Sequence, residues 1–141
     1  MRESFRRARE QRNRKIAPKS PVRHILVAFG GSDPANRTGL ALNAIAQSAA
    51  DIRTTVILGQ GAPHLDAVRQ QISALPNVTL QVDPEQMAEA MLACDLALGG
   101  AGTSAWERCC LGLPALVVVA ADNQREWADR LATLGVARVV E

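Results

Sequence analysis

Short apolar runs alternate with stretches of helical periodicity from residue 22 onward, and this alternation limits the fold more than any other feature. The first run, residues 24–29, ends at Gly30 and Gly31, as a buried strand does where it enters a turn. We expect strands at residues 24–29, 53–58, 78–82, 95–98, 115–121 and 136–140. We expect one helix to begin at Asp33 and Pro34, and others to cover residues 64–75, 87–94, 105–111 and 124–134. This order predicts the α/β class, with a Rossmann-like open sheet of six parallel strands and helices on both faces.

The charge of the chain is uneven along its length. Nine of the 16 Lys and Arg residues lie in residues 1–23, although the formal net charge is only +2. We expect residues 1–21 to be a basic interdomain linker or helix end, and residues 22–141 to be the folded domain. A basic run can bind nucleic acid, but no aromatic residue other than Phe5 interleaves it, so we expect no nucleic-acid partner.

Cysteine usage and hydropathy exclude several classes of protein. The three cysteines, Cys94, Cys109 and Cys110, have neither the even number of a disulfide framework nor the spacing of a zinc site. We therefore expect no metal. The sequence shows neither the apolar segment of a signal peptide nor a run long enough to span a membrane. We expect a cytoplasmic protein without a membrane span.

The first candidate binding motif is Gly30-Gly31-Ser32-Asp33, which follows the first expected strand. Consecutive glycines let backbone N–H groups converge, and the N-terminus of a following helix adds partial positive charge. The motif can hold a phosphate, and it can equally be an ordinary tight turn. Both interpretations stay open from the spacing alone.

The second motif is the run Gly99-Gly100-Ala101-Gly102-Thr103-Ser104, which follows the fourth expected strand and opens a helix. Gly100, Gly102 and Ala105 nearly match the dinucleotide fingerprint, although the fingerprint normally follows the first strand. Glu107 has two possible roles. It can complete a capping box with Ser104, or it can accept hydrogen bonds from the hydroxyls of a ribose.

The third motif is Asp122-Asn123-Gln124, after the fifth expected strand. Asn123 and Gln124 can hydrogen-bond a sugar, while Asp122 or Asn123 can instead cap the next helix. Neither His24 nor His64 lies in a pattern that indicates a catalytic triad. We find no general base with an orienting partner, so we expect no catalytic residue in this chain.

Four segments together resemble one protein family. They are residues 29–34 (FGGSDP), 76–78 (PNV), 95–114 (DLALGGAGTSAWERCCLGLP) and 122–124 (DNQ). The chain resembles the UDP-2,4-diacetamido-2,4,6-trideoxy-β-L-altropyranose hydrolases of pseudaminic acid biosynthesis, which include spore coat polysaccharide biosynthesis proteins. The similarity covers about residues 22–140, and the basic head of the chain, residues 1–21, resembles the family's interdomain junction. More distantly, the chain is similar to the C-terminal half of the peptidoglycan N-acetylglucosaminyltransferase, a GT-B enzyme with two Rossmann-like domains.

The resemblance implies a UDP-binding C-terminal domain, one half of a GT-B fold, with UDP or a UDP-sugar as ligand and no cofactor. It places the diphosphate on Gly99, Gly100, Ala101, Gly102, Thr103 and Ser104, and the ribose on Glu107. It places Gly30, Gly31, Ser32 and Asp33 in the interdomain cleft, with Asn123 and Gln124 near the sugar. The family's catalytic histidine lies in an N-terminal domain, which we expect to be absent from this chain and to be its partner.

Three functions stay open at this point. The first is the UDP-binding part of the hydrolase, which releases UDP from its sugar. The second is the donor-binding domain of a UDP-sugar glycosyltransferase, which needs an acceptor. The third, of another class, is a nucleotide-binding module without catalysis.

Overall fold

The computed structural model describes residues 3–15, 21–48, 51–102 and 104–140, with the backbone alone for residues 12–15. The strands in these residues are β1 (His24–Ala28), β2 (Arg53–Leu58), β3 (Val78–Val82), β4 (Leu96–Gly100), β5 (Ala115–Val118) and β6 (Ala137–Val140). The helices are α1 (Glu3–Lys15), α2 (Arg37–Gln47), α3 (Leu65–Ile72), α4 (Met87–Leu92), α5 (Ser104–Leu111) and α6 (Arg125–Thr133). A short 3₁₀ helix, η1 (Asp122–Gln124), precedes α6.

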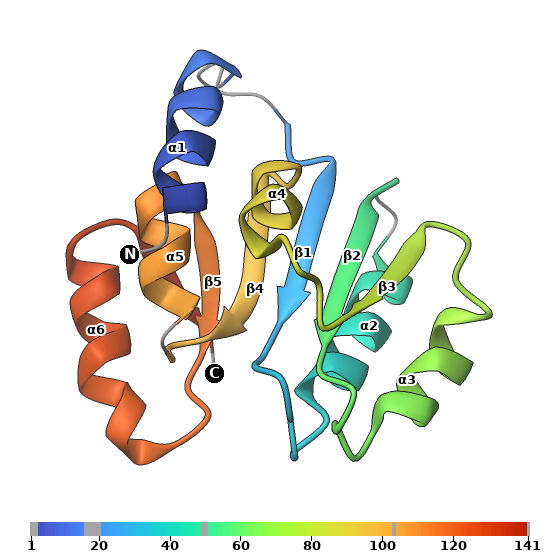
Figure 1. Ribbon diagram of the computed structural model, residues 1–141. Helices are drawn as coiled ribbons and strands as arrows, with labels where there is room; N and C mark the ends of the chain where they lie inside the picture. The colour runs from blue at the N-terminus through green and yellow to red at the C-terminus, as the bar shows by residue number, and fades with distance from the viewer. Residues whose placement is uncertain (1–2, 16–20, 49–50, 103, 141) are drawn as a thin grey trace.

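The six strands form one parallel sheet in the order β3-β2-β1-β4-β5-β6 (Figure 1). This arrangement confirms the predicted α/β class and the Rossmann-like sheet of six strands. The order reverses between β1 and β4, which are neighbours in the sheet although about 70 residues of chain separate them. Ligands of open parallel sheets bind at such a reversal, outside the carboxyl ends of the strands.

Helices cover both faces of the sheet, as predicted. Successive side chains of a strand point to opposite faces, so Leu26 and Ala28 of β1 enter one core while Val27 enters the other. The first core contains side chains of α1, α4, α5 and α6, and the second contains side chains of α2 and α3. Ala, Val and Leu supply most of both cores, in keeping with the low aromatic content of 3%.

The basic head of the chain contributes to the first core. Helix α1 runs beside α5 and also contacts α4 (Figure 1). Phe5 and Ala8 lie on its inner side and are 1% and 6% exposed, whereas Arg6, Arg7 and Arg9 face the solvent. The assignment of residues 1–21 to a segment between two domains stays a prediction, and residues 16–20 lie outside the described residues.

Several expected boundaries were wrong, and the start of α2 has a clear physical reason. Helix α2 begins at Arg37 rather than at Asp33 and Pro34, because Asn36 is its N-cap and accepts a hydrogen bond from the Gly39 N–H. Asp33 has a positive φ of 37°, which a helix does not permit. Other boundaries differ by one to three residues: β4 continues through Gly100, β5 ends at Val118, and α3 ends at Ile72.

No helix within the described ranges has the length and apolar character that crossing a membrane requires.

The packing of α1 gives a prediction about stability. Phe5→Ala removes a nearly fully buried aromatic side chain, so we expect the free energy of unfolding to fall by about 3–5 kcal/mol. Ser4→Ala, at the neighbouring exposed position of the same helix, is the control and should change it by less than about 0.5 kcal/mol. Urea unfolding followed by circular dichroism measures both. Equal stability of the two variants would show that α1 does not belong to the folded domain.

Candidate functional site

The glycine turns that follow β1 and β4 lie side by side at the carboxyl edge of the sheet. Ala28 of β1 pairs in register with Gly99 of β4, which brings Gly30 and Gly31 next to the segment that leaves β4. Gly30 has a φ of +99°, a conformation that residues with a side chain rarely adopt. Both glycine turns therefore share one edge of the sheet.

The glycines at this edge differ in what surrounds them. A Cβ at Gly99 would overlap the carbonyl oxygen of Ala28 and would lie 2.9 Å from Nη1 of Arg108. Nothing lies within 4 Å of a Cβ built at Gly30, Gly31 or Gly102. Gly99 is therefore required by the packing of the protein itself, whereas the other three leave open space for a ligand that approaches the backbone.

The segment that we call the glycine loop consists of Gly100, the last residue of β4, with Ala101 and Gly102, and it leads into the first turn of α5. Ala101 is 4% exposed, and Gly102 accepts a hydrogen bond from the Ala105 N–H at 2.9 Å. Helix α5 spans Ser104–Leu111, with Glu107 in its first turn, and the capping box stays a prediction. Thr103, which we expected to contact the diphosphate, lies outside the described residues.

Arg108 lies directly beneath the glycine loop and is 2% exposed. Its Nη2 donates to the carbonyl oxygen of Gly100 at 2.5 Å, and its Nη1 donates to the Ser104 hydroxyl at 3.3 Å. Burial lowers the pKa of the Arg108 guanidinium, while the charges of Cys109 and Glu107 act in the opposite direction. Arg108 was not among the sequence-predicted site residues. Its burial depends on Gly99 and Gly100 of another element, which no local pattern reveals.

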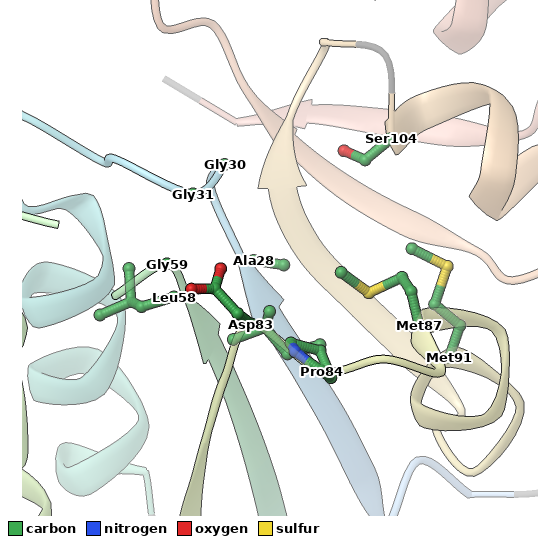
Figure 2. Close-up of a pocket in the computed structure, with 11 residues that line it drawn as sticks. Ala28, Gly30, Gly31, Leu58, Gly59, Asp83, Pro84, Met87, Met91 and Ser104 are labelled. Atoms are coloured by element: carbon green, nitrogen blue, oxygen red, sulfur yellow. The ribbon is translucent and has the colours of Figure 1, made fainter. Parts of the chain in front are cut away.

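A cavity of about 240 Å³ opens beside the two glycine turns. Figure 2 shows Ser104 above Met87 and Met91, with Gly30 and Gly31 on the other side of the pocket. The remaining lining residues are Ala28, Ile57, Leu58, Gly59, Asp83 and Pro84. The lining is mainly apolar, and Asp83 holds the neighbouring turn by accepting a hydrogen bond from the Gln60 N–H at 2.8 Å.

The sequence did not predict that Asp83 and helix α4 contribute to this cavity. Asp83 follows the end of β3, and Met87 and Met91 belong to α4, so the cavity is assembled from segments that only the sheet order brings together. The positions of Met87 and Met91, four residues apart, did indicate an inward face of the helix. That spacing cannot distinguish a residue of the core from one that lines a cavity.

The predicted cleft residues lie at this edge but differ in exposure. Ser32 is exposed, whereas Asp33 is 4% exposed. The Asp33 carboxylate accepts hydrogen bonds from the N–H groups of Arg37 and Thr38 at 3.0 and 2.8 Å. Asp33 therefore holds the turn that leads into α2.

Asn123 and Gln124 lie in η1, after β5. Asn123 is exposed, and Gln124 Oε1 accepts a hydrogen bond from the Ala120 N–H at 3.3 Å. A Cβ built at Gly100 would lie 3.9 Å from Gln124 Oε1, so this side chain borders the glycine loop. Among the residues that the structure describes, no three His, Cys, Asp or Glu side chains form a group that could hold a metal ion.

Comparison with known sequences gives a family and two informative relatives. The model of the glycosyltransferase family 28 C-terminal domain matches residues 24–141. The spore coat polysaccharide biosynthesis protein SpsG of Bacillus subtilis (strain 168) is 34% identical over 122 residues, which cover 84% of this chain and 36% of SpsG. The UDP-N-acetylglucosamine--N-acetylmuramyl-(pentapeptide) pyrophosphoryl-undecaprenol N-acetylglucosamine transferase of Exiguobacterium sp. (strain ATCC BAA-1283 / AT1b) is 30% identical over 124 residues, which cover 84% of this chain and 35% of the transferase.

Solved structures share the fold. MurG of Acinetobacter baumannii superposes with a TM-score of 0.68 at 24% identity, over 94% of this chain and 39% of MurG. Spinosyn rhamnosyltransferase SpnG, complexed with thymidine diphosphate, superposes with a TM-score of 0.64 at 21% identity, over 87% of this chain and 33% of SpnG. The chain thus spans between a third and two fifths of the length of these four proteins.

The different surroundings of the glycines give a second prediction. Gly99→Ala forces its Cβ against Ala28 and Arg108, so we expect the free energy of unfolding to fall by about 1–3 kcal/mol. Gly102→Ala meets no atom within 4 Å and should change it by less than about 0.5 kcal/mol. Thermal or urea unfolding of the two variants checks this. A Gly99→Ala protein as stable as the wild type would show that β1 and β4 do not approach as closely as described.

Proposed function

Because the chain belongs to the family of glycosyltransferase family 28 C-terminal domains, we propose that it binds the nucleotide of a UDP-sugar at the carboxyl edge of β1 and β4. The observation that carries this proposal is the meeting of two open glycine turns beside a cavity at the point where the strand order reverses. Parallel sheets bind nucleotides at this position, and glycines let the backbone approach phosphate groups closely.

The diphosphate would lie over the glycine loop and the first turn of α5. A helix N-terminus carries partial positive charge and unsatisfied N–H groups, both of which favour an anion. Gly102 presents open space to a ligand there, and the half-buried Ser104 borders both the loop and the cavity. The side chain of Ser104 can reach either the diphosphate or the nucleoside.

The nucleoside would occupy the cavity next to the loop. Its mainly apolar lining, with the flexible side chains of Met87 and Met91, suits the faces of a planar base. Glu107 is half-buried in the first helical turn above the loop, where a carboxylate can accept hydrogen bonds from two neighbouring hydroxyls. Glu107 would thus bind the ribose, as the family resemblance implies.

The sugar would extend toward the first glycine turn and η1. Gly30, Gly31 and Ser32 are exposed at one side of this position, with Asn123 and Gln124 at the other. Asp33 would act indirectly, since its carboxylate is committed to the backbone of α2.

For the whole protein we propose hydrolysis of UDP-2,4-diacetamido-2,4,6-trideoxy-β-L-altropyranose in surface polysaccharide biosynthesis. The relation to SpsG and the family resemblance of residues 95–114 support this activity. An N-terminal domain that faces the cleft would supply the catalytic histidine and would be the partner of this domain. Transfer of the sugar to an acceptor is the second candidate, because the relation to the Exiguobacterium transferase covers the same domain.

Binding of UDP gives the third prediction. Glu107→Gln should weaken UDP binding at least tenfold, which is about 1.4 kcal/mol, because an amide accepts hydrogen bonds from ribose hydroxyls less well than a carboxylate. The same substitution should weaken binding of 2′-deoxy-UDP by a smaller factor, since that ligand offers Glu107 only one of the two hydroxyls. Isothermal titration calorimetry with both ligands measures the difference.

Asp66→Asn is the matched control for Glu107→Gln. It removes an exposed acidic group from the first turn of α3, outside the proposed site, and should leave both affinities unchanged. A loss of thermal stability in Glu107→Gln with unchanged UDP affinity would assign Glu107 to the helix terminus alone. Equal affinity of the wild type for UDP, thymidine diphosphate and NAD would contradict a uridine site.

The fourth prediction is that the 141-residue chain alone does not release UDP from the UDP-sugar. Activation of water by a general base contributes about 10²–10⁴-fold, and the carboxylate of Asp33 is occupied by backbone N–H groups. A coupled assay for UDP, with and without a separately expressed N-terminal domain, measures the activity. Steady turnover by the chain alone that Asp122→Asn abolishes would place the catalytic residue in this domain.

A further inference from the structure

Arg108 is a buried cation that forms no ion pair among the described residues, although the charges of Cys109 and Glu107 act on it. It is the largest of the fully buried side chains, and its two hydrogen bonds go to the neutral Gly100 carbonyl and Ser104 hydroxyl. Its Nε is buried and has no hydrogen-bond partner among the described residues. The ion pairs in the described part of the chain do not include it. Burying a charge is costly, and buried arginines are normally paired with carboxylates.

A bracing role accounts for only part of this arrangement. The two hydrogen bonds tie the end of β4 to the start of α5, and a neutral donor such as glutamine could make bonds of the same kind. Bracing therefore explains a donor at position 108 but does not explain a permanent positive charge there. Gly99 is part of the same arrangement, because any side chain at that position would collide with the guanidinium.

The positive charge of Arg108 lies next to the backbone of the glycine loop. Nη2 is 2.5 Å from the Gly100 oxygen, and open space adjoins Gly102, two residues further along the loop. The N-terminus of α5 contributes partial positive charge at the same place. An anion above the loop would therefore interact with both, through a region from which the protein excludes water.

We propose that Arg108 is a positioning residue that holds the glycine loop and supplies a fixed positive charge to it, so that the loop selects a diphosphate over an uncharged nucleoside. This inference rests on the proposed function in that the anion is the diphosphate of the UDP-sugar. Arg108 does not touch the ligand, because the loop separates the two. Its contribution consequently grows with the charge of the ligand and is absent for uridine.

The test compares ligands of different charge on variants that separate charge from hydrogen bonding. Wild type, Arg108→Lys and Arg108→Gln are titrated with UDP, UMP, uridine and inorganic pyrophosphate by isothermal titration calorimetry. Arg108→Gln should bind UDP at least tenfold more weakly, UMP by a smaller factor, and uridine unchanged. Arg108→Lys keeps the charge and should recover most of the UDP affinity. A purely structural role would weaken uridine and UDP by the same factor, which would overturn the inference.

A measurement on the wild type covers the case in which the variants do not fold. The buried Nε–H of Arg108 is shielded from solvent, so its proton resonance can be followed by NMR. The resonance should shift with UDP and pyrophosphate and stay in place with uridine. No shift with any phosphate-containing ligand would overturn the inference.

The outcomes also separate this inference from the proposed function. UDP binding that is unaffected by Arg108→Gln would leave the uridine site intact and remove the role of Arg108. Pyrophosphate binding that depends on Arg108, without selectivity for uridine compounds, would support the anion site and contradict the proposed nucleotide. Absence of binding by UDP and pyrophosphate alike would contradict both.

Discussion

The pairing of β1 with β4 is the constraint on which the rest of the molecule depends. These two strands meet with Ala28 opposite Gly99, and the missing side chain at Gly99 lets the Ala28 carbonyl and the Arg108 guanidinium approach. The pairing places both glycine turns at one edge and reverses the strand order between them. Helices α2 and α3 can then cover one face while α1, α4, α5 and α6 pack against the other. The position of the candidate site is thus a direct result of one strand contact.

Most of the fold could be predicted from the sequence because its signals are local and repeated. Each strand is a short apolar run, and each is bounded by glycine, proline or polar residues that end it. The start of α2 could not be placed correctly, since Asp33 and Asn36 are both good caps and only the backbone conformation decides between them. The docking of α1 was hidden for a related reason. A helix with many arginines has a weak apolar pattern, and burial of Phe5 and Ala8 depends on the neighbouring α5.

The candidate site divides into a part that is readable from the sequence and a part that is not. The positions of the glycine turns are readable, because closely spaced glycines follow the ends of two expected strands. Arg108 is not, because a charged residue in a short helix is normally exposed and only the glycines of β4 make room for it. The cavity is not readable either. Asp83 and Met87 follow β3 in the chain, and only the order of the strands in the sheet brings them to the glycine turns of β1 and β4.

The contact between Gly99 and Arg108 also has an evolutionary consequence. A Cβ at position 99 would overlap the backbone carbonyl oxygen of Ala28 and would lie 2.9 Å from Nη1 of Arg108, which is the end of a flexible side chain and can move aside. Loss of the arginine would relax only part of the constraint on position 99, since the Ala28 carbonyl still fills the other side. The constraint is therefore asymmetric: Arg108 can be replaced while Gly99 is retained, whereas a side chain at position 99 requires a wider spacing of β1 and β4.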